Sequence, residues 1–481
     1  MYQILKKGGE KGPSPIAPQP LRSQRKVIGV ISRRLADFIY ETDFGTLPKT
    51  TVHMAKLAFL DWLGSTAAGG RQAPFQKALA VLREQGGAPQ ATLLPVWEKT
   101  SCLNAALGNG LASHIVELDD VHRAAIIHAG AAVMPAALAV AEMTGASGRQ
   151  LLEAIVVGYE VAIRVGEAVT PSHYYFWHTT GTCGTFGAAA AAGKLLGLNR
   201  EQLVWALGNA GTQAAGLWEF LADGAMSKHL HPGKAAQNGV LAALLAKEDF
   251  TGATRILEGD RGFCRATAPQ FDLAVITAGL GRPPYKVEEN SFKIHASCRH
   301  THPAVDITLD LAARNAIKTA EVAAITVRTY GTALNITANY RPDSVYAAKF
   351  SLPFCVALAL KRGRCGLADF TPEALADAEI QALTARVKLE RDSELEALHP
   401  ARWPAAVEIT TAQGKTYKGR TDFPIGDPEN PATDEELLDK FYNLASGPWG
   451  EQRARTLAKT VLNLERDKGT GLLSPQGSIR P

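Results

Sequence analysis

Residues 131–142 read Ala-Ala-Val-Met-Pro-Ala-Ala-Leu-Ala-Val-Ala-Glu, and this run places small apolar side chains on most faces of a helix. Four further segments share this Ala- and Leu-rich character: residues 151–165, 184–196, 201–210 and 235–245. Such helices are buried, and small side chains let them pack closely on one another. One-sided helical patterns at 31–39 and 51–63 come first, and no alternating strand pattern interrupts the region. The sequence therefore predicts a large all-helical domain over residues 28–279.

Alternating apolar and polar residues, which are typical of half-buried strands, begin after about Gly279. Strands are predicted at residues 325–330, 386–390, 407–410 and 416–421, the last two joined by a turn at 412–414. Helices are predicted at residues 299–316, 346–360 and 372–383. Strands mixed with helices in this way predict a smaller α+β domain over residues 280–430.

A helical pattern returns near the C-terminus. Thr433 and Glu436 form a capping box, and a rigid Pro- and Gly-containing turn at 424–431 precedes it. We expect the helices of residues 431–472 to pack back on the helical domain. The predicted fold class is thus mainly α, with a large all-helical domain and a smaller α+β domain.

Composition narrows the class of protein. The chain has 481 residues, 46% of them hydrophobic and 20% charged, which is typical of proteins with a sizeable core. The 51 basic and 47 acidic residues give a net charge of +4, which does not favour a nucleic-acid or membrane partner. Six scattered cysteines indicate reduced thiols and a cytoplasmic location. Residues 1–27 are basic, resemble no secretory signal and are predicted to form a disordered arm.

Several familiar catalytic motifs are missing from the sequence. It has no GxxxxGK[ST] phosphate loop, no HExxH zinc motif and no GxSxG nucleophile motif. Gly108-Asn109-Gly110 is a fragment of a dinucleotide fingerprint that follows no predicted strand, so we expect no nicotinamide cofactor. Gly181, Gly184 and Gly187 open an Ala-rich run, and we interpret their three-residue spacing as a sign of close helix packing.

Histidine placement is the most informative feature. Ten of the twelve histidines fall in four short segments: residues 114–128, 173–178, 229–231 and 295–302. Each segment also carries charged or hydroxyl side chains. A single buried histidine is more often a satisfied core residue, but four such clusters at the ends of helical segments favour a functional site.

Two kinds of site fit these clusters. A metal could bind the histidine pairs 229/231 and 300/302 together with the carboxylates of Asp119 and Asp120. Cations accompany the same histidines: Lys228, Lys234, Lys293 and Arg299. They would repel a metal, whereas they pair well with substrate carboxylates while a histidine transfers a proton. We therefore expect a cationic site with no metal and no cofactor; the alternative interpretation of the lysines is a solvated face.

At these residues the sequence resembles the MmgE/PrpD family, whose members include 2-methylcitrate dehydratases, cis-aconitate decarboxylases and an iminodisuccinate epimerase. The resemblance covers nearly the whole chain after about residue 28, and its motifs are specific through their order and spacing together. They include Leu60-Asp61-Trp62-Leu63-Gly64, the segment from Asn109 to His128, Gly158-Tyr159-Glu160-Val161, His178-x-Thr180, Lys228-His229-Leu230-His231-Pro232-Gly233-Lys234, Lys293 with Cys298, Phe350-Ser351-Leu352-Pro353 and Gly426-Asp427-Pro428-Glu429-Asn430-Pro431.

The resemblance implies both a fold and a set of site residues. Family members have a large helical domain and a smaller lid, with the active site between them, and they are usually homodimers. By the same resemblance the site includes an acidic residue of the 117–120 stretch. The catalytic candidates are Asp120, His128, His178 and Lys293. The substrate-binding candidates are Glu117, Thr180, Lys228, His231, Cys298 and Arg299.

The implied function is that of a cofactor-independent lyase, similar to 2-methylcitrate dehydratase, which acts on a small di- or tricarboxylic acid. Lys228 and Lys293 would hold carboxylates and stabilise the charge that develops when an adjacent carbon loses a proton. His128 or His178 would take that proton and the other would protonate the leaving hydroxyl, while Asp120 orients a histidine.

Three positions depart from the family pattern and bear on the alternatives. Val121 replaces a threonine, Ala129 replaces the proline after His128, and Phe354 lies near the place where decarboxylase members have an aromatic hydroxyl. The loss of these hydroxyls argues against decarboxylation and leaves the exact substrate open. A decarboxylase, an epimerase or racemase using the same deprotonation, and a non-catalytic carboxylate-binding homologue are the alternatives.

Overall fold

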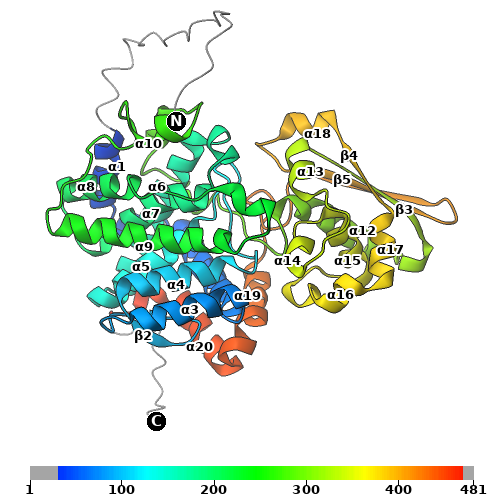
Figure 1. Cartoon of the computed structure of the whole chain (residues 1–481), viewed down its shortest axis with the longest axis horizontal. Helices are drawn as coiled ribbons and strands as arrows, with labels where there is room; N and C mark the ends of the chain where they lie inside the picture. The colour runs from blue at the N-terminus through cyan, green and yellow to red at the C-terminus, as the bar shows by residue number, and fades with distance from the viewer. Residues whose placement is uncertain (1–30, 470–481) are drawn as a thin grey trace, which may run out of the picture.

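The computed structural model describes residues 31–469, so the predicted arm at residues 1–27 lies outside the described residues. Two lobes are visible in Figure 1, a body built of helices and a smaller lobe that carries a sheet with helices. The chain is therefore mainly α with a smaller α+β region, as the sequence predicts. Among the helices between residues 31 and 469, none has the length and apolar character needed to cross a membrane.

Eleven helices make up the body in the part of the chain that the structure describes. They are α1 (Ile31–Glu41), α2 (Lys49–Gly69), α3 (Ala73–Gln85), α4 (Cys102–His114), α5 (Ala129–Thr144), α6 (Gly148–Val169), α7 (Thr179–Leu195), α8 (Arg200–Gly211), α9 (Ser227–Lys247), α10 (Phe263–Thr267) and α11 (Leu273–Thr277). The five Ala- and Leu-rich segments correspond to α5 through α9. Helix α7 is central and contacts α5, α6 and α9. A Cβ on Gly187 of α7 would lie 2.5 Å from the carbonyl oxygen of Gly158 on α6, so close packing explains this glycine, as predicted.

A short hairpin interrupts the body, and here the prediction of an all-helical region is wrong. Strands β1 (Ala91–Leu93) and β2 (Glu98–Thr100) pair antiparallel. Strands of three residues are too short to show the two-residue alternation on which the prediction depended. Asn109 holds the hairpin against α4, because its side chain accepts from the Leu94 N–H at 2.9 Å and donates to the Thr92 carbonyl at 2.8 Å.

The smaller lobe is organised around a four-stranded sheet. Its strands are β3 (Val322–Thr329), β4 (Val387–Arg391), β5 (Ala405–Thr411) and β6 (Thr416–Thr421), in the order β4-β3-β5-β6. Strand β4 runs parallel to β3, whereas β5 and β6 form the predicted antiparallel hairpin. The helices of this lobe are α12 (His302–Asn315), α13 (Gly331–Thr337), α14 (Val345–Ala348), α15 (Leu352–Arg362), α16 (Pro372–Ala376), α17 (Ala378–Ala385) and α18 (Ser393–Leu398).

Two helices of this lobe that the sequence predicts as continuous are each broken in two. Residues 346–360 divide into α14 and α15, because Ser351 caps α15 by accepting from the Phe354 N–H at 3.1 Å and Pro353 lacks the N–H that a continuous helix would need there. Residues 372–383 divide into α16 and α17 at Asp377, whose carboxylate caps α17. Local capping therefore overrides the apolar periodicity at both places.

The C-terminal helices α19 (Asp434–Trp449) and α20 (Glu451–Leu462) lie against the body, and α19 contacts α2 (Figure 1). The capping box of Thr433 and Glu436 is present as predicted. Lys440 of α19 binds the buried Asp61 carboxylate at 2.5 Å and the Leu118 carbonyl at 2.7 Å. Helix α19 thus reaches the loop that follows α4.

Two chain segments connect the lobes: the first connection contains Phe292 and the second connection contains Gly426. They are bound to each other, because the Phe292 N–H donates to the Gly426 carbonyl at 2.9 Å. Gly426 has a φ of +92°, and a Cβ there would lie 2.1 Å from the Phe292 carbonyl oxygen, so a larger residue would separate the segments.

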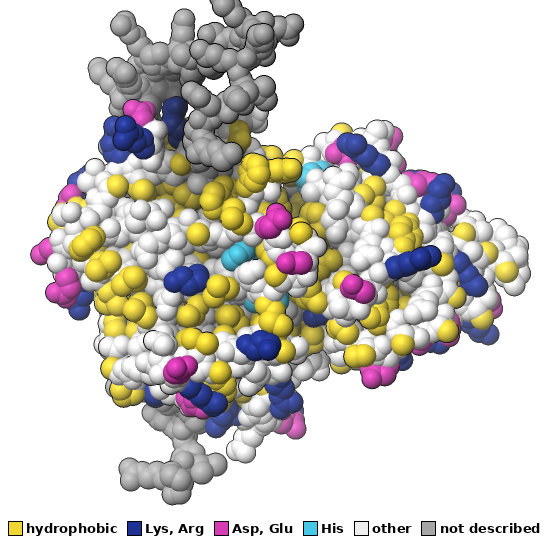
Figure 2. All heavy atoms as spheres, viewed as in Figure 1, with side chains coloured by type: hydrophobic (Ala, Val, Ile, Leu, Met, Phe, Trp, Pro, Cys, Tyr) yellow, Lys and Arg dark blue, Asp and Glu magenta, His cyan; other side chains and the backbone are white. Residues whose placement is uncertain are grey.

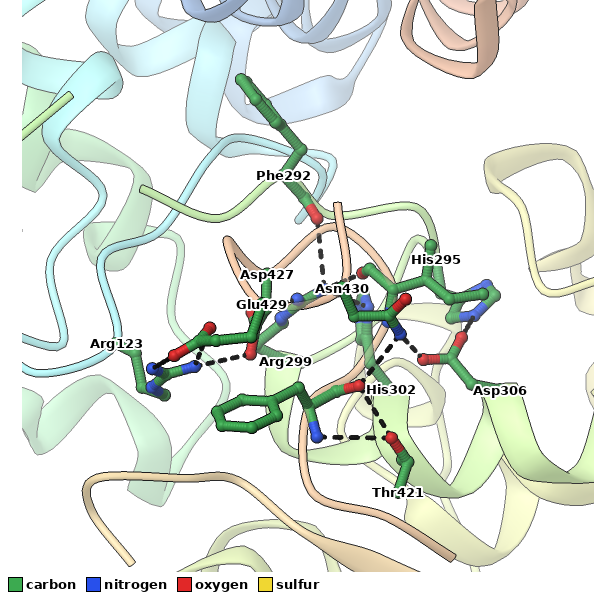
Figure 3. A network of polar contacts seen from close by, with 12 residues as sticks. Arg123, Phe292, His295, Arg299, His302, Asp306, Thr421, Asp427, Glu429 and Asn430 are labelled. Atoms are coloured by element: carbon green, nitrogen blue, oxygen red, sulfur yellow. Dashed lines mark hydrogen bonds and ion pairs between the residues drawn. The ribbon is translucent and has the colours of Figure 1, made fainter. Parts of the chain in front are cut away.

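A group of charged residues, which we call the hinge cluster, surrounds this crossing (Figure 3). It consists of Arg123, Arg299, Asp427 and Glu429. Asp427 accepts from Arg299 at 2.5 Å and from Arg123 at 2.9 Å, and Arg123 also binds Glu429 at 2.6 Å. Two cations and two carboxylates therefore hold the body, the start of α12 and the second connection together.

Candidate active site

Side chains from both lobes converge where the loop after α4 meets the starts of α7 and α9. The body supplies His114 at the end of α4, the 117–128 loop, His178, Lys228 and His231. The first connection supplies Lys293, and α14 with the residue that follows it supplies Tyr346 and Lys349. Histidine atoms are visible at the boundary between the lobes in Figure 2. The site thus lies between the two lobes.

A carboxylate surrounded by lysines, which we call the lysine cluster, forms one side of this site. It consists of Glu117, Lys228, Lys293 and Lys349. Glu117 binds the Lys228 ammonium directly and lies 3.6 Å from the Lys293 ammonium, and all three side chains are buried. Burial alone would raise the pKa of Glu117, but the lysines lower it below its ordinary value, so the carboxylate is ionised.

Lys349 and Tyr346 reach this cluster from the smaller lobe. The Lys349 ammonium donates to the Val116 carbonyl at 3.0 Å, and no carboxylate among the described residues lies within 4.0 Å of it. Burial lowers the pKa of Lys349 to about 8, although Glu117 opposes the shift. The Tyr346 hydroxyl donates to Glu117 at 3.3 Å. The cluster therefore has three buried cations for one carboxylate.

Asp119 lies on the other side of the site, between two imidazoles. Its Oδ2 is 2.6 Å from Nδ1 of His114 and 3.2 Å from Nδ1 of His128. Burial would raise the pKa of Asp119, but the two imidazoles lower it well below its ordinary value. His114 and Asp119 are fully buried, whereas the His128 side chain is 15% exposed. His128 is thus the member of this trio that solvent or a substrate can reach.

Asp120 does not play the role that the sequence predicts for its side chain. Its carboxyl group binds the Tyr159 hydroxyl at 2.5 Å, the Asn290 amide at 2.5 Å and the Gly130 N–H at 3.2 Å. Only its backbone carbonyl contacts His128, at 2.7 Å from Nδ1. Asp120 is correctly placed beside His128, but the neighbouring Asp119 is the carboxylate that touches the histidines. Burial raises the pKa of Asp120 to about 7.

A second pair of histidines faces the first. His178 and His231 approach with their Nδ1 atoms 3.1 Å apart, so one ring donates and the other accepts. Burial lowers the pKa of His231 to about 4 and that of His178 well below its ordinary value, so both rings are neutral at pH 7. Thr180 lies two residues after His178, and its hydroxyl accepts from the backbone N–H of His128 at 3.0 Å. It therefore joins the chain segment of the second pair to that of the first.

The structure separates the last two candidates, Cys298 and Arg299. Cys298 is buried near Lys293, and burial raises the pKa of its thiol to about 11, so it is not a thiolate. Arg299 belongs to the hinge cluster, and its other donors bind the Phe292 and Ile425 carbonyls at 3.2 Å and 3.1 Å. The structure therefore points to an architectural role for Arg299 rather than the predicted contact with substrate.

Two groups of side chains among residues 31–469 have spacings that a metal ion could use. In the first, His128 Nδ1 faces the Asp120 carbonyl, which only accepts, so this nitrogen must carry a proton and cannot be a ligand. In the second, the Lys286 ammonium already binds Glu167 at 2.9 Å and Glu289 at 2.6 Å, beside His122. Both groups are therefore better described as hydrogen-bonded networks.

Comparison with family models covers both lobes. The MmgE/PrpD N-terminal domain matches residues 33–276, and the MmgE/PrpD C-terminal domain matches residues 295–466. The chain belongs to the MmgE/PrpD family. The histidines and lysines described above thus lie within, or directly between, the two matched regions of this MmgE/PrpD protein.

Curated relatives of this MmgE/PrpD chain align over most of its length. It is 28% identical over 452 residues to cis-aconitate decarboxylase of Aspergillus terreus, which covers 87% of this chain and 90% of the relative. It is 27% identical over 469 residues to cis-aconitate decarboxylase of Homo sapiens, with 90% and 92% covered. The relatives support lyase chemistry at a coarse level.

The structure brings four further side chains to the site of this family member: His114 and Asp119, which were predicted only as part of a histidine cluster and as a possible metal ligand, and Tyr346 and Lys349, which were not predicted. The first two lie in the histidine-rich segment that the sequence singles out, so proximity to His128 was the available signal. Tyr346 and Lys349 lie in a predicted helix, just before the motif Phe350-Ser351-Leu352-Pro353, and the helix in fact breaks between α14 and α15 at this point. No pattern of spacing could have found those two.

Proposed function

We propose that this chain is a lyase that acts on a small di- or tricarboxylic acid by moving a proton at a carbon next to a carboxylate. The observation that carries the proposal is the surplus of buried cations in the lysine cluster beside neutral histidines. Buried charges that the protein does not pair are costly, so an anionic ligand would stabilise this arrangement.

His128 is the base in this proposal. Both groups facing its Nδ1, the Asp120 carbonyl and the ionised Asp119 carboxylate, accept hydrogen bonds and donate none. The proton of the neutral ring therefore resides on Nδ1, which leaves the Nε2 lone pair to take a proton from the substrate carbon. Lys228 and Lys293 would hold the carboxylate that receives the resulting negative charge.

The second histidine pair has a different part in the proposed reaction. Because one Nδ1 donates to the other, the neutral pair of His178 and His231 presents one accepting nitrogen and one N–H. That N–H can hydrogen-bond a leaving hydroxyl in a dehydration, and it can orient the departing carboxylate in a decarboxylation. Residues of both lobes are needed, so closure between the lobes would exclude water from the reaction.

Two reactions within this class have specific support. The relatives named cis-aconitate decarboxylase favour loss of CO₂. Phe354, which stands where decarboxylase members have a hydroxyl, favours loss of water; in the structure it is buried and packs against Phe370. We retain both candidates, with the 2-methylcitrate dehydratase type and the cis-aconitate type tested side by side.

The test is turnover of purified chain with cis-aconitate, 2-methylcitrate and citrate, read as CO₂ release and as alkene absorbance. His128→Gln should lower turnover by about 10²–10⁴-fold, since one general base contributes that much. His53→Gln is the matched control, because His53 is exposed and binds only Asp434. Deuterium exchange in D₂O without loss of water or CO₂ would identify an epimerase, and tight binding without any exchange would overturn the proposal.

The remaining expectations are proposals of a different kind. The family resemblance predicts a homodimer, and we propose that state for the purified chain. Sedimentation equilibrium should give twice the 51.3 kDa mass of one chain, whereas a single-chain mass would contradict it. The cytoplasmic location stays a prediction, which fractionation of cells expressing the tagged chain would check.

A further inference from the structure

We propose that Asp119 is a positioning residue which fixes the proton on Nδ1 of two histidines at once, and that His114 is the second of these. This inference rests on the proposed function, since it concerns the histidines of the same site. It goes further by giving a role to a shared carboxylate and a buried imidazole that are not among the predicted catalytic or substrate-binding residues.

The geometry of His114 supports the proposal. Its Nδ1 has one partner among the described residues, the Asp119 carboxylate at 2.6 Å. Because an ionised carboxylate only accepts, the neutral His114 ring must carry its proton on Nδ1. The opposite nitrogen, Nε2, is completely buried and has no hydrogen-bond partner among residues 31–469. A buried nitrogen with a free lone pair requires either a proton or a donor from a ligand.

The surroundings of that nitrogen belong to the proposed site. The His114 ring lies 4.8 Å from the His128 ring and stacks on the His178 ring at 5.4 Å, measured between centroids. Burial is the main reason that the pKa of His114 is lowered, with Lys228 adding to the shift. His114 is therefore kept as a neutral acceptor at the centre of the imidazoles rather than as a cation.

Asp119 treats the two rings unequally, which makes its role testable. His128 Nδ1 has a second acceptor, the Asp120 carbonyl at 2.7 Å, and the Asp119 oxygen is more distant at 3.2 Å. His114 has no such second acceptor. Removing the carboxylate should thus let His114 carry its proton on either ring nitrogen, whereas His128 should keep its proton mainly on Nδ1.

The first experiment needs no substrate. Nitrogen-15 spectra of the full chain, labelled on histidine, report which ring nitrogen carries the proton. His114→Gln and His128→Gln assign the two signals. We expect protonated Nδ1 in both rings of the unmodified chain. Asp119→Leu, which has no acceptor, should convert His114 to a tautomer mixture, whereas Asp119→Asn retains an oxygen and should preserve it. Unchanged His114 signals in Asp119→Leu would overturn the proposal.

The second experiment measures turnover of the acid that the assay with cis-aconitate, 2-methylcitrate and citrate identifies as the substrate. Asp119→Leu should lower kcat by about 10²-fold or more with little change in KM, and Asp119→Asn should fall between it and the unmodified chain. Glu258→Gln is the control, because Glu258 is a buried carboxylate of the body that binds Ser32 and no histidine. A kcat for Asp119→Asn that is about 10²-fold below that of the unmodified chain, with the tautomers preserved, would contradict the proposal even if Asp119→Leu failed to fold.

These two experiments separate the inference from the proposed function. If the chain turns over no di- or tricarboxylate, the proposed function fails, while the spectra still decide whether Asp119 sets the tautomers. If turnover is found but the tautomers do not respond to Asp119→Leu, the function stands and the positioning role is refuted.

Discussion

The lysine cluster and the hinge cluster are groups of charges that include buried ion pairs, and they differ in the balance of cations and carboxylates. The hinge cluster matches Arg123 and Arg299 with Asp427 and Glu429. The lysine cluster places three ammonium groups around Glu117 alone. A balanced buried network satisfies itself, whereas an unbalanced one requires charge from outside the chain. The comparison indicates that the first group maintains the architecture and that the second receives a ligand.

The largest effect should come from the unbalanced cluster. Lys293→Met keeps the length of the side chain but removes a cation that would stabilise the developing negative charge. We expect kcat/KM to fall by about 10³-fold, as for other groups that stabilise such charge. Lys318→Met, an exposed lysine of the smaller lobe, is the control and should keep full activity. Steady-state kinetics measures both variants. A normal kcat/KM in Lys293→Met would refute the conclusion that the lysine cluster receives a ligand.

The balanced cluster should respond in stability. Asp427→Asn leaves the buried Arg299 guanidinium without its carboxylate and takes one partner from the partly buried Arg123, and breaking a buried pair in this way costs about 3–5 kcal/mol. The free energy of unfolding, measured from urea titrations, should fall by that amount. If the urea midpoint stayed where it is in the unmodified chain, the hinge cluster would not be the structural element that its geometry indicates.

As the pH falls, protonation of buried histidines such as His229 should lower the stability of the fold at a higher pH than protonation of Asp427 in the hinge cluster does. Burial lowers the pKa of His229 to about 3 from an ordinary value of 6.5. Between these two pH values the unfolded chain binds more protons than the folded one, so stability falls as the pH falls from about 6.5 towards 3. Each such histidine contributes up to about 1.4 kcal/mol per pH unit. The pKa of Asp427 is lowered from 3.8, so its contribution is lost only below about pH 4.

Thermal unfolding at a series of pH values between 7 and 4 checks this order. In His229→Gln the stability should decline less steeply over that range than in the unmodified chain. His53→Gln should leave the slope unchanged, since His53 is exposed on the surface of α2. A His229→Gln slope identical to that of the unmodified chain would show that the buried histidines do not govern acid sensitivity.

The smallest effect is expected at the rim of the hinge cluster. The Glu429 side chain is 40% exposed, and ion pairs of that kind contribute about 0–1 kcal/mol. Glu429→Gln should therefore shift the urea midpoint barely at all, in contrast to Asp427→Asn. If Glu429→Gln lost as much free energy of unfolding as Asp427→Asn, the exposure of a carboxylate would not determine how much it contributes to stability.

The fold and the site also differ in how much of each the sequence predicted. Apolar periodicity located most helices of the body and the strands of the sheet, because those patterns report burial directly. It failed at β1 and β2, which are too short to alternate, and at the breaks before Leu352 and after Asp377, where capping decides. Predictions of the site placed Glu117, His128, His178, Lys228 and Lys293 together, as the structure does.

Errors in the site arose from neighbours that the sequence cannot tell apart. Asp119 and Asp120 are adjacent, and only the backbone conformation around them turns one carboxylate to the histidines and the other to Tyr159. Cys298 and Arg299 are adjacent as well, and they face the site and the hinge respectively. Residue type and spacing therefore specify the region, while the direction of a side chain requires the folded chain.

The contact between Phe292 and Gly426 gives the crossing of the two connections one further consequence. Lys293 is the next residue after Phe292, so the ammonium that faces Glu117 is carried by the same short stretch of backbone that is bonded to Gly426. A Cβ at position 426 would lie 2.1 Å from the Phe292 carbonyl oxygen, so a larger residue there would displace the backbone next to Lys293. The absence of a side chain at Gly426 therefore bears on where a charge of the site lies as well as on how the lobes are joined.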